Sequence, residues 1–95
     1  MPPDLRVSEV RYSPASRDDS ALGLLGYASF LINGAVRVDG VAVRRSLAGR
    51  LILAWPARTD AAGKRHAYLR PISDEARLAL EEQVLSALGM AGGAP

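Results

Sequence analysis

Apolar residues recur along this chain at two spacings, and each spacing predicts a different kind of element. Over residues 5–55 they alternate with polar or small residues, or form short uninterrupted runs, as in β-strands. Over residues 74–88 they recur every three to four positions, as along one side of a helix. The extended stretches predicted in this way are residues 5–12, 22–32, 35–38, 41–44, 50–55 and, as a short return, 65–69.

Turn-forming residues separate these stretches. Asn33-Gly34 is the strongest signal, because a two-residue type I′ hairpin needs positive φ at both central positions and these residues tolerate it. The other predicted breaks are a turn or β-bulge at Asp39-Gly40, a turn at 46–49, a strand end at Pro56, and polar loops at 13–20 and 59–63.

Clear start and stop signals bound the predicted helix. Ser73 can cap its first turn by accepting from exposed amides, and Asp74 and Glu75 complement the positive end of the helix dipole. Gly89 supplies a C-cap, so the helix runs to about residue 88. Its apolar stripe is Leu80, Val84, Leu85 and Leu88, and Arg77, Glu81 and Glu82 lie on or beside the opposite face.

Together these elements predict an α+β fold. No connection before residue 73 is long enough to hold a crossover helix, so the strands pair antiparallel. We expect a small twisted sheet of four or five strands, joined by hairpins, with the C-terminal helix packed on one face. The whole chain, residues 1–95, forms one domain, with an ordered core over about 5–88 and a flexible tail over 89–95.

Composition narrows the class of protein. A chain of 95 residues buries only about 60–65% of its unfolded surface, so a homodimer through an edge strand would add useful stability. The absence of cysteine excludes disulfides and thiolate metal sites. No secretory signal is visible, and the longest uncharged run is too short and glycine-broken to span a membrane. We therefore expect a cytoplasmic protein without membrane contact.

The charge is strongly segregated along the chain. Between residues 37 and 70 there are eight basic residues and two acidic ones, a net charge of +6, whereas the rest of the chain carries −4. Segregation of this kind produces a field that attracts a polyanion. Eleven of the twelve cations are arginine, which fits either a genomic compositional bias or a use of the planar guanidinium for phosphate.

The order of motifs resembles that of a known family. The shared features are a first strand ending in Val10-Arg11, a hairpin, a strand running into Trp55-Pro56, a basic loop, Gly63 seven residues after Pro56, Pro71-Ile72 eight residues after Gly63, and a capped helix containing Arg77. From about residue 5 to residue 88, the chain is similar to the stage V sporulation protein G (SpoVG, septation regulator) family.

This resemblance implies a function. Members of the family are small α+β proteins that dimerise by strand association and bind DNA or RNA without enzymatic activity. The implied role is regulation of gene expression connected with septation, cell division or sporulation. Arg58 matches the first member of a basic pair that the family uses for nucleic acid, while Thr59 stands at the second position and His66 at a further family arginine.

The candidate nucleic-acid contacts are basic residues in or near the loop. Because Arg58, Lys64, Arg65 and His66 share one predicted loop, they can converge on a phosphate backbone. The further candidates are Arg70, Arg44 and Arg45. Adjacent strand residues point to opposite faces, so at most one of the last two shares a face with the loop.

Aromatic residues next to the basic loop suggest a second kind of contact. Trp55 and Tyr68 flank it and could stack on bases, although the favoured interpretation of Trp55 is a core residue packed under the helix. Phe30 is predicted to lie in the core.

Two other classes of function have some support in the sequence. An enzyme would have to use His66 with Asp60, or Ser46 or Ser73 as a nucleophile, yet no nucleophile-elbow, phosphate-loop or metal-ligand spacing accompanies these residues. We therefore expect no catalytic residues, metal, cofactor or small-molecule substrate. The alternative to nucleic-acid binding is a dimeric interaction module whose basic face meets an acidic protein, which the sequence does not separate from it.

Overall fold

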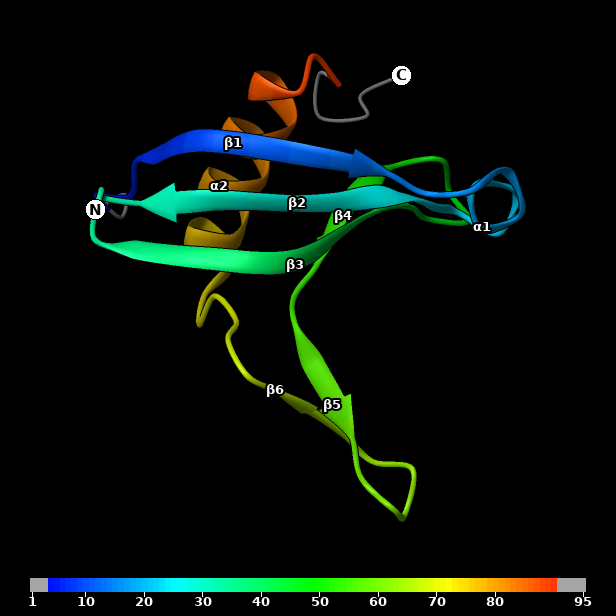
Figure 1. The fold of residues 1–95 in the computed structure, drawn as a ribbon. Coiled ribbons are helices and arrows are strands. Elements are labelled where there is room, and N and C mark those ends of the chain that lie inside the picture. The colour runs from blue at the N-terminus through cyan, green and yellow to red at the C-terminus, as the bar shows by residue number, and fades with distance from the viewer. Residues whose placement is uncertain (1–3, 91–95) are drawn as a thin grey trace.

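The computed structural model describes residues 4–90 of the chain, and it shows a small α+β fold (Figure 1). Four strands form an antiparallel sheet in the order β1-β2-β3-β4, and two further strands form a separate ribbon. In chain order the elements are β1 (Val7–Pro14), α1 (Arg17–Ala21), β2 (Leu24–Ile32), β3 (Val36–Arg45), β4 (Leu51–Ala54), β5 (Ala57–Thr59), β6 (Arg65–Ala67) and α2 (Asp74–Ala87). The predicted fold class is confirmed.

The hairpin between β2 and β3 forms as predicted. Asn33 and Gly34 have φ angles of 54° and 62°, and the amide of Ala35 donates to the carbonyl of Ile32 at 3.0 Å. This is the geometry of a type I′ turn, which matches the right-handed twist of the strands. Gly40, with φ 71°, lies where the register between β2 and β3 shifts, so Asp39-Gly40 forms a bulge within one continuous strand.

The predicted polar loop at 13–20 is partly wrong. β1 continues to Pro14, and residues 17–21 form the short helix α1. The hydroxyl of Ser16 caps this helix by accepting from the amide of Asp19 at 3.2 Å. A helix this short has no apolar periodicity to reveal it, so the sequence pattern predicted only a polar loop.

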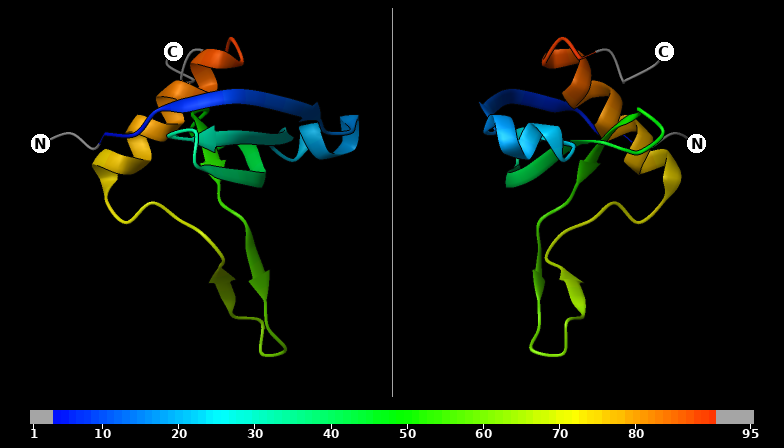
Figure 2. Two further views of the ribbon diagram at one scale, coloured as in Figure 1. Left: turned by 60° about the vertical axis from the view of Figure 1, so that its left-hand side comes forward. Right: turned by 90° about the vertical axis from the view of Figure 1, so that its right-hand side faces the viewer.

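The return strand does not join the sheet. β6 pairs with β5, and together they form a ribbon that projects away from the sheet (Figures 1 and 2). We call residues 57–67 the arm. Pro56 ends the pairing of β4 as predicted, but the chain continues in an extended conformation beyond it. The arm therefore presents its side chains outside the globular part of the molecule.

Helix α2 covers one face of the sheet (Figure 2). Ser73 caps it by accepting from the amide of Ala76 at 3.1 Å, and Gly89, with φ 73°, follows its end, so both predicted signals are confirmed. The predicted stripe is also confirmed, because Leu80, Val84 and Leu85 are buried and Leu88 packs against the core. The core residues of the sheet are Ala28, Phe30, Val38, Val41, Val43, Leu51 and Leu53.

One residue assigned to the outer side of α2 is buried instead. Glu81 is only 5% exposed. Its Oε2 accepts from the amide of Leu53 at 3.3 Å, and its Oε1 accepts from Arg77 Nη1 at 3.1 Å. The prediction failed because the carboxylate satisfies a backbone amide on the free side of β4, a requirement set by the sheet and not by the helix pattern.

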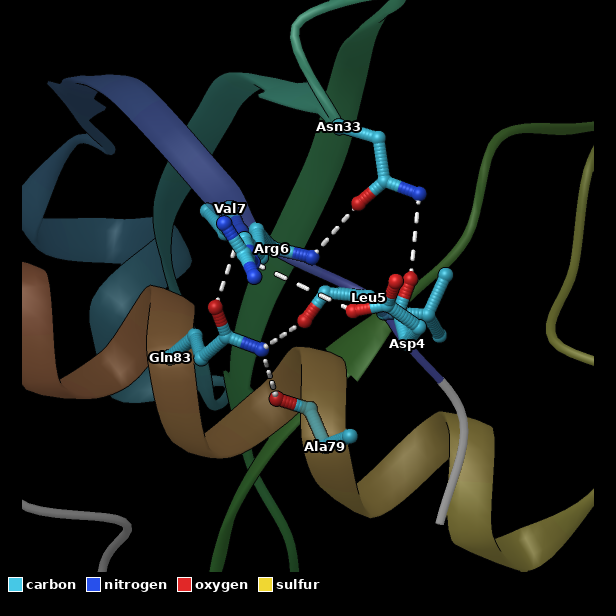
Figure 3. A network of polar contacts seen from close by, with 7 residues as sticks. All are labelled: Asp4, Leu5, Arg6, Val7, Asn33, Ala79 and Gln83. Carbon is cyan, nitrogen blue, oxygen red and sulfur yellow. Dashed lines mark hydrogen bonds and ion pairs between the residues drawn. The ribbon is translucent and has the colours of Figure 1, made fainter. Parts of the chain in front are cut away.

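Gln83 makes the corresponding hydrogen bond to a backbone amide of β1 (Figure 3). Its Oε1 accepts from the amide of Val7 at 2.8 Å, while its Nε2 donates to the carbonyls of Leu5 and Ala79 at 2.7 and 3.1 Å. Residues two apart on a helix point in nearly opposite directions. Glu81 and Gln83 therefore reach the two outer strands of the sheet from one helix.

The last predicted segment is only partly described. Met90 is half-buried and packs against the core. The rest of the predicted tail, residues 91–95, lies outside the described residues.

Candidate nucleic-acid interface

The arm carries the predicted cations on a two-stranded ladder. Ala57 pairs with Ala67, Arg58 with His66, and Thr59 with Arg65. Directly opposed residues of an antiparallel ladder share a face, and neighbours along a strand alternate. Arg58 and His66 therefore lie on one face of the arm and Arg65 on the other, so the four predicted contacts do not converge on one surface.

Asp60 shapes the tip of the arm. Its Oδ1 accepts from the amides of Ala62 and Lys64, both at 2.9 Å, and its own carbonyl accepts from the amide of Gly63 at 3.0 Å. Gly63 has φ 84°, which a side chain would resist, and this explains the need for glycine in the turn. The tip is thus a tight, internally bonded turn that holds exposed Lys64 at its end.

The single histidine is bonded within the arm. His66 Nε2 lies 2.7 Å from Asp60 Oδ2. This hydrogen bond, followed by the one from the Lys64 amide, lowers the pKa of Asp60 below its ordinary value of 3.8. Asp60 therefore stays ionised at neutral pH and engaged with the turn and the imidazole. Because one nitrogen of His66 is engaged, the structure gives this residue a partner other than a phosphate.

The remaining cations of the arm have no acidic partner. Arg58, Lys64 and Arg65 form no ion pair with any carboxylate in the described part of the chain. Arg65 does donate from Nη2 to the carbonyl of Trp55 at 3.2 Å, which orients its side chain toward the base of the arm. All three side chains are exposed. The arm consequently presents three cations whose charge is not locally compensated.

Arg70 follows the arm and lines an apolar hollow of about 210 Å³ between the base of the arm and α2. The hollow is also lined by Trp55, Leu69 and Ile72, and Ile72 is 92% exposed. Trp55 packs edge-to-face on Phe30, with ring centroids 6.1 Å apart, so the core interpretation of Trp55 is confirmed. Its buried Nε1 has no hydrogen-bond partner among the described residues.

The two arginines at the end of β3 diverge as predicted. Arg44 pairs with Ile52 and Arg45 with Leu51, and Leu51 belongs to the core face. Arg44 therefore lies on the face that α2 leaves open. Arg45 donates instead to the carbonyl of Gly49 at 3.2 Å, within the turn that joins β3 to β4. The structure thus separates Arg45 from the other candidates.

The other singled-out polar groups have local structural roles. Ser73 caps α2, and the hydroxyl of Ser46 accepts from the amide of Arg50 at 3.2 Å. Tyr68 is 70% exposed at the base of the arm, where its amide donates to the carbonyl of Pro56. Tyr68 therefore remains an accessible aromatic next to the cations, as the sequence suggested.

No protein-family model matches this chain, and no curated protein matches it significantly. Among residues 4–90, no helix is long and apolar enough to cross a membrane. The same residues contain no group of three or more potential metal ligands placed to hold an ion.

Proposed function

We propose that this protein is a non-enzymatic, cytoplasmic nucleic-acid-binding regulator that contacts phosphates of DNA or RNA through the arm. The observation that carries the proposal is the charge arrangement of the arm. Its only carboxylate, on Asp60, is held by two turn amides and His66, while Arg58, Lys64 and Arg65 are exposed and lack acidic partners. A projecting element with uncompensated cations suits a polyanionic backbone.

The resemblance to the SpoVG family supports the same proposal. The frame of Pro56, Gly63 and Pro71-Ile72 that carries it corresponds here to the start of the arm, the glycine of its tip and the approach to α2. From that resemblance we propose a role in controlling gene expression during septation or sporulation.

Neutralising the arm should weaken binding and flatten its salt dependence. Each phosphate contact contributes about 0.9 to the slope of log affinity against log salt on duplex DNA. We expect Arg58→Ala, Lys64→Ala and Arg65→Ala each to reduce the magnitude of the slope by about 0.9 and the triple variant by about 2.7. Titrations of duplex DNA, single-stranded DNA and RNA at several salt concentrations measure this.

Arg17→Ala is the matched control for these variants. Arg17 is an exposed arginine on α1, far from the arm in Figure 1, so its removal changes the net charge by the same amount. If the arm variants and the control behave alike, or if the wild-type protein binds no nucleic acid at physiological salt, the arm is not a phosphate site.

We further propose a homodimer formed through an edge strand. The amide of Leu53 on β4 and that of Val7 on β1 already donate to Glu81 and Gln83, which blocks part of each outer edge of the sheet. The outer sides of β5 and β6 have no strand partner among residues 4–90 and are open for pairing. Sedimentation at micromolar concentration should give twice the 10.1 kDa of one chain, and a monomer would contradict this proposal.

The apolar hollow favours one alternative, a dimeric interaction module whose basic face binds an acidic protein. Exposed Ile72 beside Arg70 offers an apolar contact next to a positive charge. The two functions differ in competition: excess nonspecific DNA displaces a nucleic-acid ligand from the arm, but it does not displace a partner held by the hollow.

A further inference from the structure

The second face of the sheet is open. Helix α2 packs on the face that carries the core, and no element of residues 4–90 covers the other one (Figures 1 and 2). Such a face exposes alternate residues of all four strands at once. It is lined mainly by polar and small side chains, with Tyr27 as its only aromatic residue among those described.

Tyr27 stands in a row of small residues. Across the sheet it is directly opposed by Ser13 on β1 and Ala42 on β3, and Ala42 is opposed by Ala54 on β4. None of these neighbours is large enough to cover the ring, and Tyr27 is 47% exposed although it lies on a central strand. The phenol is therefore accessible to a flat ligand lying on the sheet.

Two arginines flank this tyrosine. Arg11 pairs with Ser29, and Arg44 with Ile52, so each lies on a strand next to β2 and two residues along from the position opposite Tyr27. On a regular ladder such diagonal neighbours are about 7–8 Å apart, within reach of an arginine side chain, and this spacing applies to Arg11. On the Arg44 side, a register shift between Leu24 and Gly26 of β2 interrupts the ladder. Neither arginine forms an ion pair with a carboxylate of residues 4–90.

The carboxylates of this face lie on the Arg11 side of Tyr27, where other groups engage them. Glu9 lies 3.7 Å from Arg37 Nη2, and Asp39 accepts from the hydroxyl of Ser29 at 2.7 Å. The same hydroxyl accepts from Arg37 Nη1 at 3.2 Å, so these groups form one cluster at the turn end of the sheet. Arg44 lies on the other side of Tyr27 from this cluster, opposite Leu24, so it is the cation of this face that the cluster does not compensate.

We propose that this open face binds single-stranded nucleic acid, with one base stacked on Tyr27 and the adjoining phosphates held by Arg11 and Arg44. An exposed aromatic ring between free cations suits an unpaired strand, because only unpaired bases offer their flat faces for stacking. A duplex would present phosphates alone. The inference rests on the proposed function and adds two statements to it: the ligand is single-stranded, and Tyr27 is the residue that stacks on a base.

The position of the open face relative to the arm supports one continuous binding path for a single strand of nucleic acid. The row that contains Tyr27 ends at Ala54, and the chain passes from there through Trp55 and Pro56 directly into the arm. Strands are about 4.8 Å apart, so Tyr27 lies roughly 10 Å from the strand that leads to the arm. A short single strand can therefore contact Tyr27 and the arm cations together.

The test compares binding of short oligouridine, oligothymidine and duplex DNA of equal length by the full chain and its variants. We expect Tyr27→Leu to weaken binding of both single strands about 5- to 100-fold and to leave duplex binding unchanged, because leucine keeps apolar bulk but cannot stack. Tyr27→Phe retains the ring and should bind like the wild type. A preference for oligouridine over oligothymidine would identify RNA as the source of the strand.

Tyr68→Leu is the matched control, since Tyr68 is the other accessible aromatic near the cations. If it reduces single-strand binding and Tyr27→Leu does not, the open face is not the stacking site, although the proposed function stands. If Tyr27→Leu changes the sedimentation coefficient instead, a second copy covers the face and the inference is wrong. If the wild type binds none of the three probes, the proposed function fails with it.

Discussion

Replacing Phe30 with alanine is expected to lower the free energy of unfolding by about 3–5 kcal/mol. Phe30 is fully buried at the centre of the core and stacks edge-to-face with Trp55. The substitution removes the largest buried side chain on the sheet and leaves a cavity that the surrounding strands cannot fill. For a domain whose total stability is about 5–14 kcal/mol, this is a large fraction.

Urea unfolding followed by the fluorescence of Trp55, the single tryptophan of the chain, measures the change. Leu47→Ala is the control, because Leu47 is fully exposed in the turn between β3 and β4 and should change stability by less than about 0.5 kcal/mol. Equal unfolding midpoints for the two variants would mean that Phe30 is not in the core.

The second large effect is expected at Glu81. Glu81→Ala removes the acceptor of the Leu53 amide and the partner of Arg77, and it leaves a buried donor unsatisfied. A lost partner of this kind costs about 1–3 kcal/mol, and a fully buried ion pair costs more. Because the Arg77 side chain is 38% exposed, solvent screens the charge, and we expect a loss of about 2–3 kcal/mol.

Glu81→Gln separates the two contributions. Glutamine keeps an oxygen for the Leu53 amide but loses the charge opposite Arg77, so its loss of stability should be about 1 kcal/mol. Arg77→Ala, which leaves the Glu81–Leu53 hydrogen bond in place, tests the other partner. A loss below 0.5 kcal/mol for Glu81→Ala, on the order of an ordinary surface substitution, would contradict the buried position of this carboxylate.

The parts of the fold that the sequence predicted correctly depend on local interactions. The β2–β3 hairpin follows from the backbone preferences of Asn33 and Gly34, and the bounds of α2 follow from Ser73 and Gly89. These signals act over a few residues and need no knowledge of the rest of the chain.

The parts that the sequence missed depend on distant partners. Glu81 reads as a surface residue until β4 places an amide beside it, 28 residues away in the chain. The separation of the arm from the sheet is equally non-local, because short strands do not reveal which neighbour they will pair with.

The candidate site also combines local features, which the sequence predicted, with features that depend on distant partners, which it did not. The sequence identifies Arg58, Lys64 and Arg65 from charge alone, and all three lie on the arm. Their distribution over the two faces of the arm required the register of β5 and β6. Tyr27 was visible only as one aromatic in an apolar run, since nothing local shows that α2 covers the opposite face.

The pairing of Glu81 and Gln83 with the two outer strands has a consequence for assembly. A single helix blocks part of both outer edges of the sheet, so loss of α2 would free both edges at once. A sheet with one open side can pair once and stop, whereas a sheet open on two sides can add copies without limit. The C-terminal helix therefore restrains edge-to-edge pairing at both outer strands together, which favours limited over open-ended association.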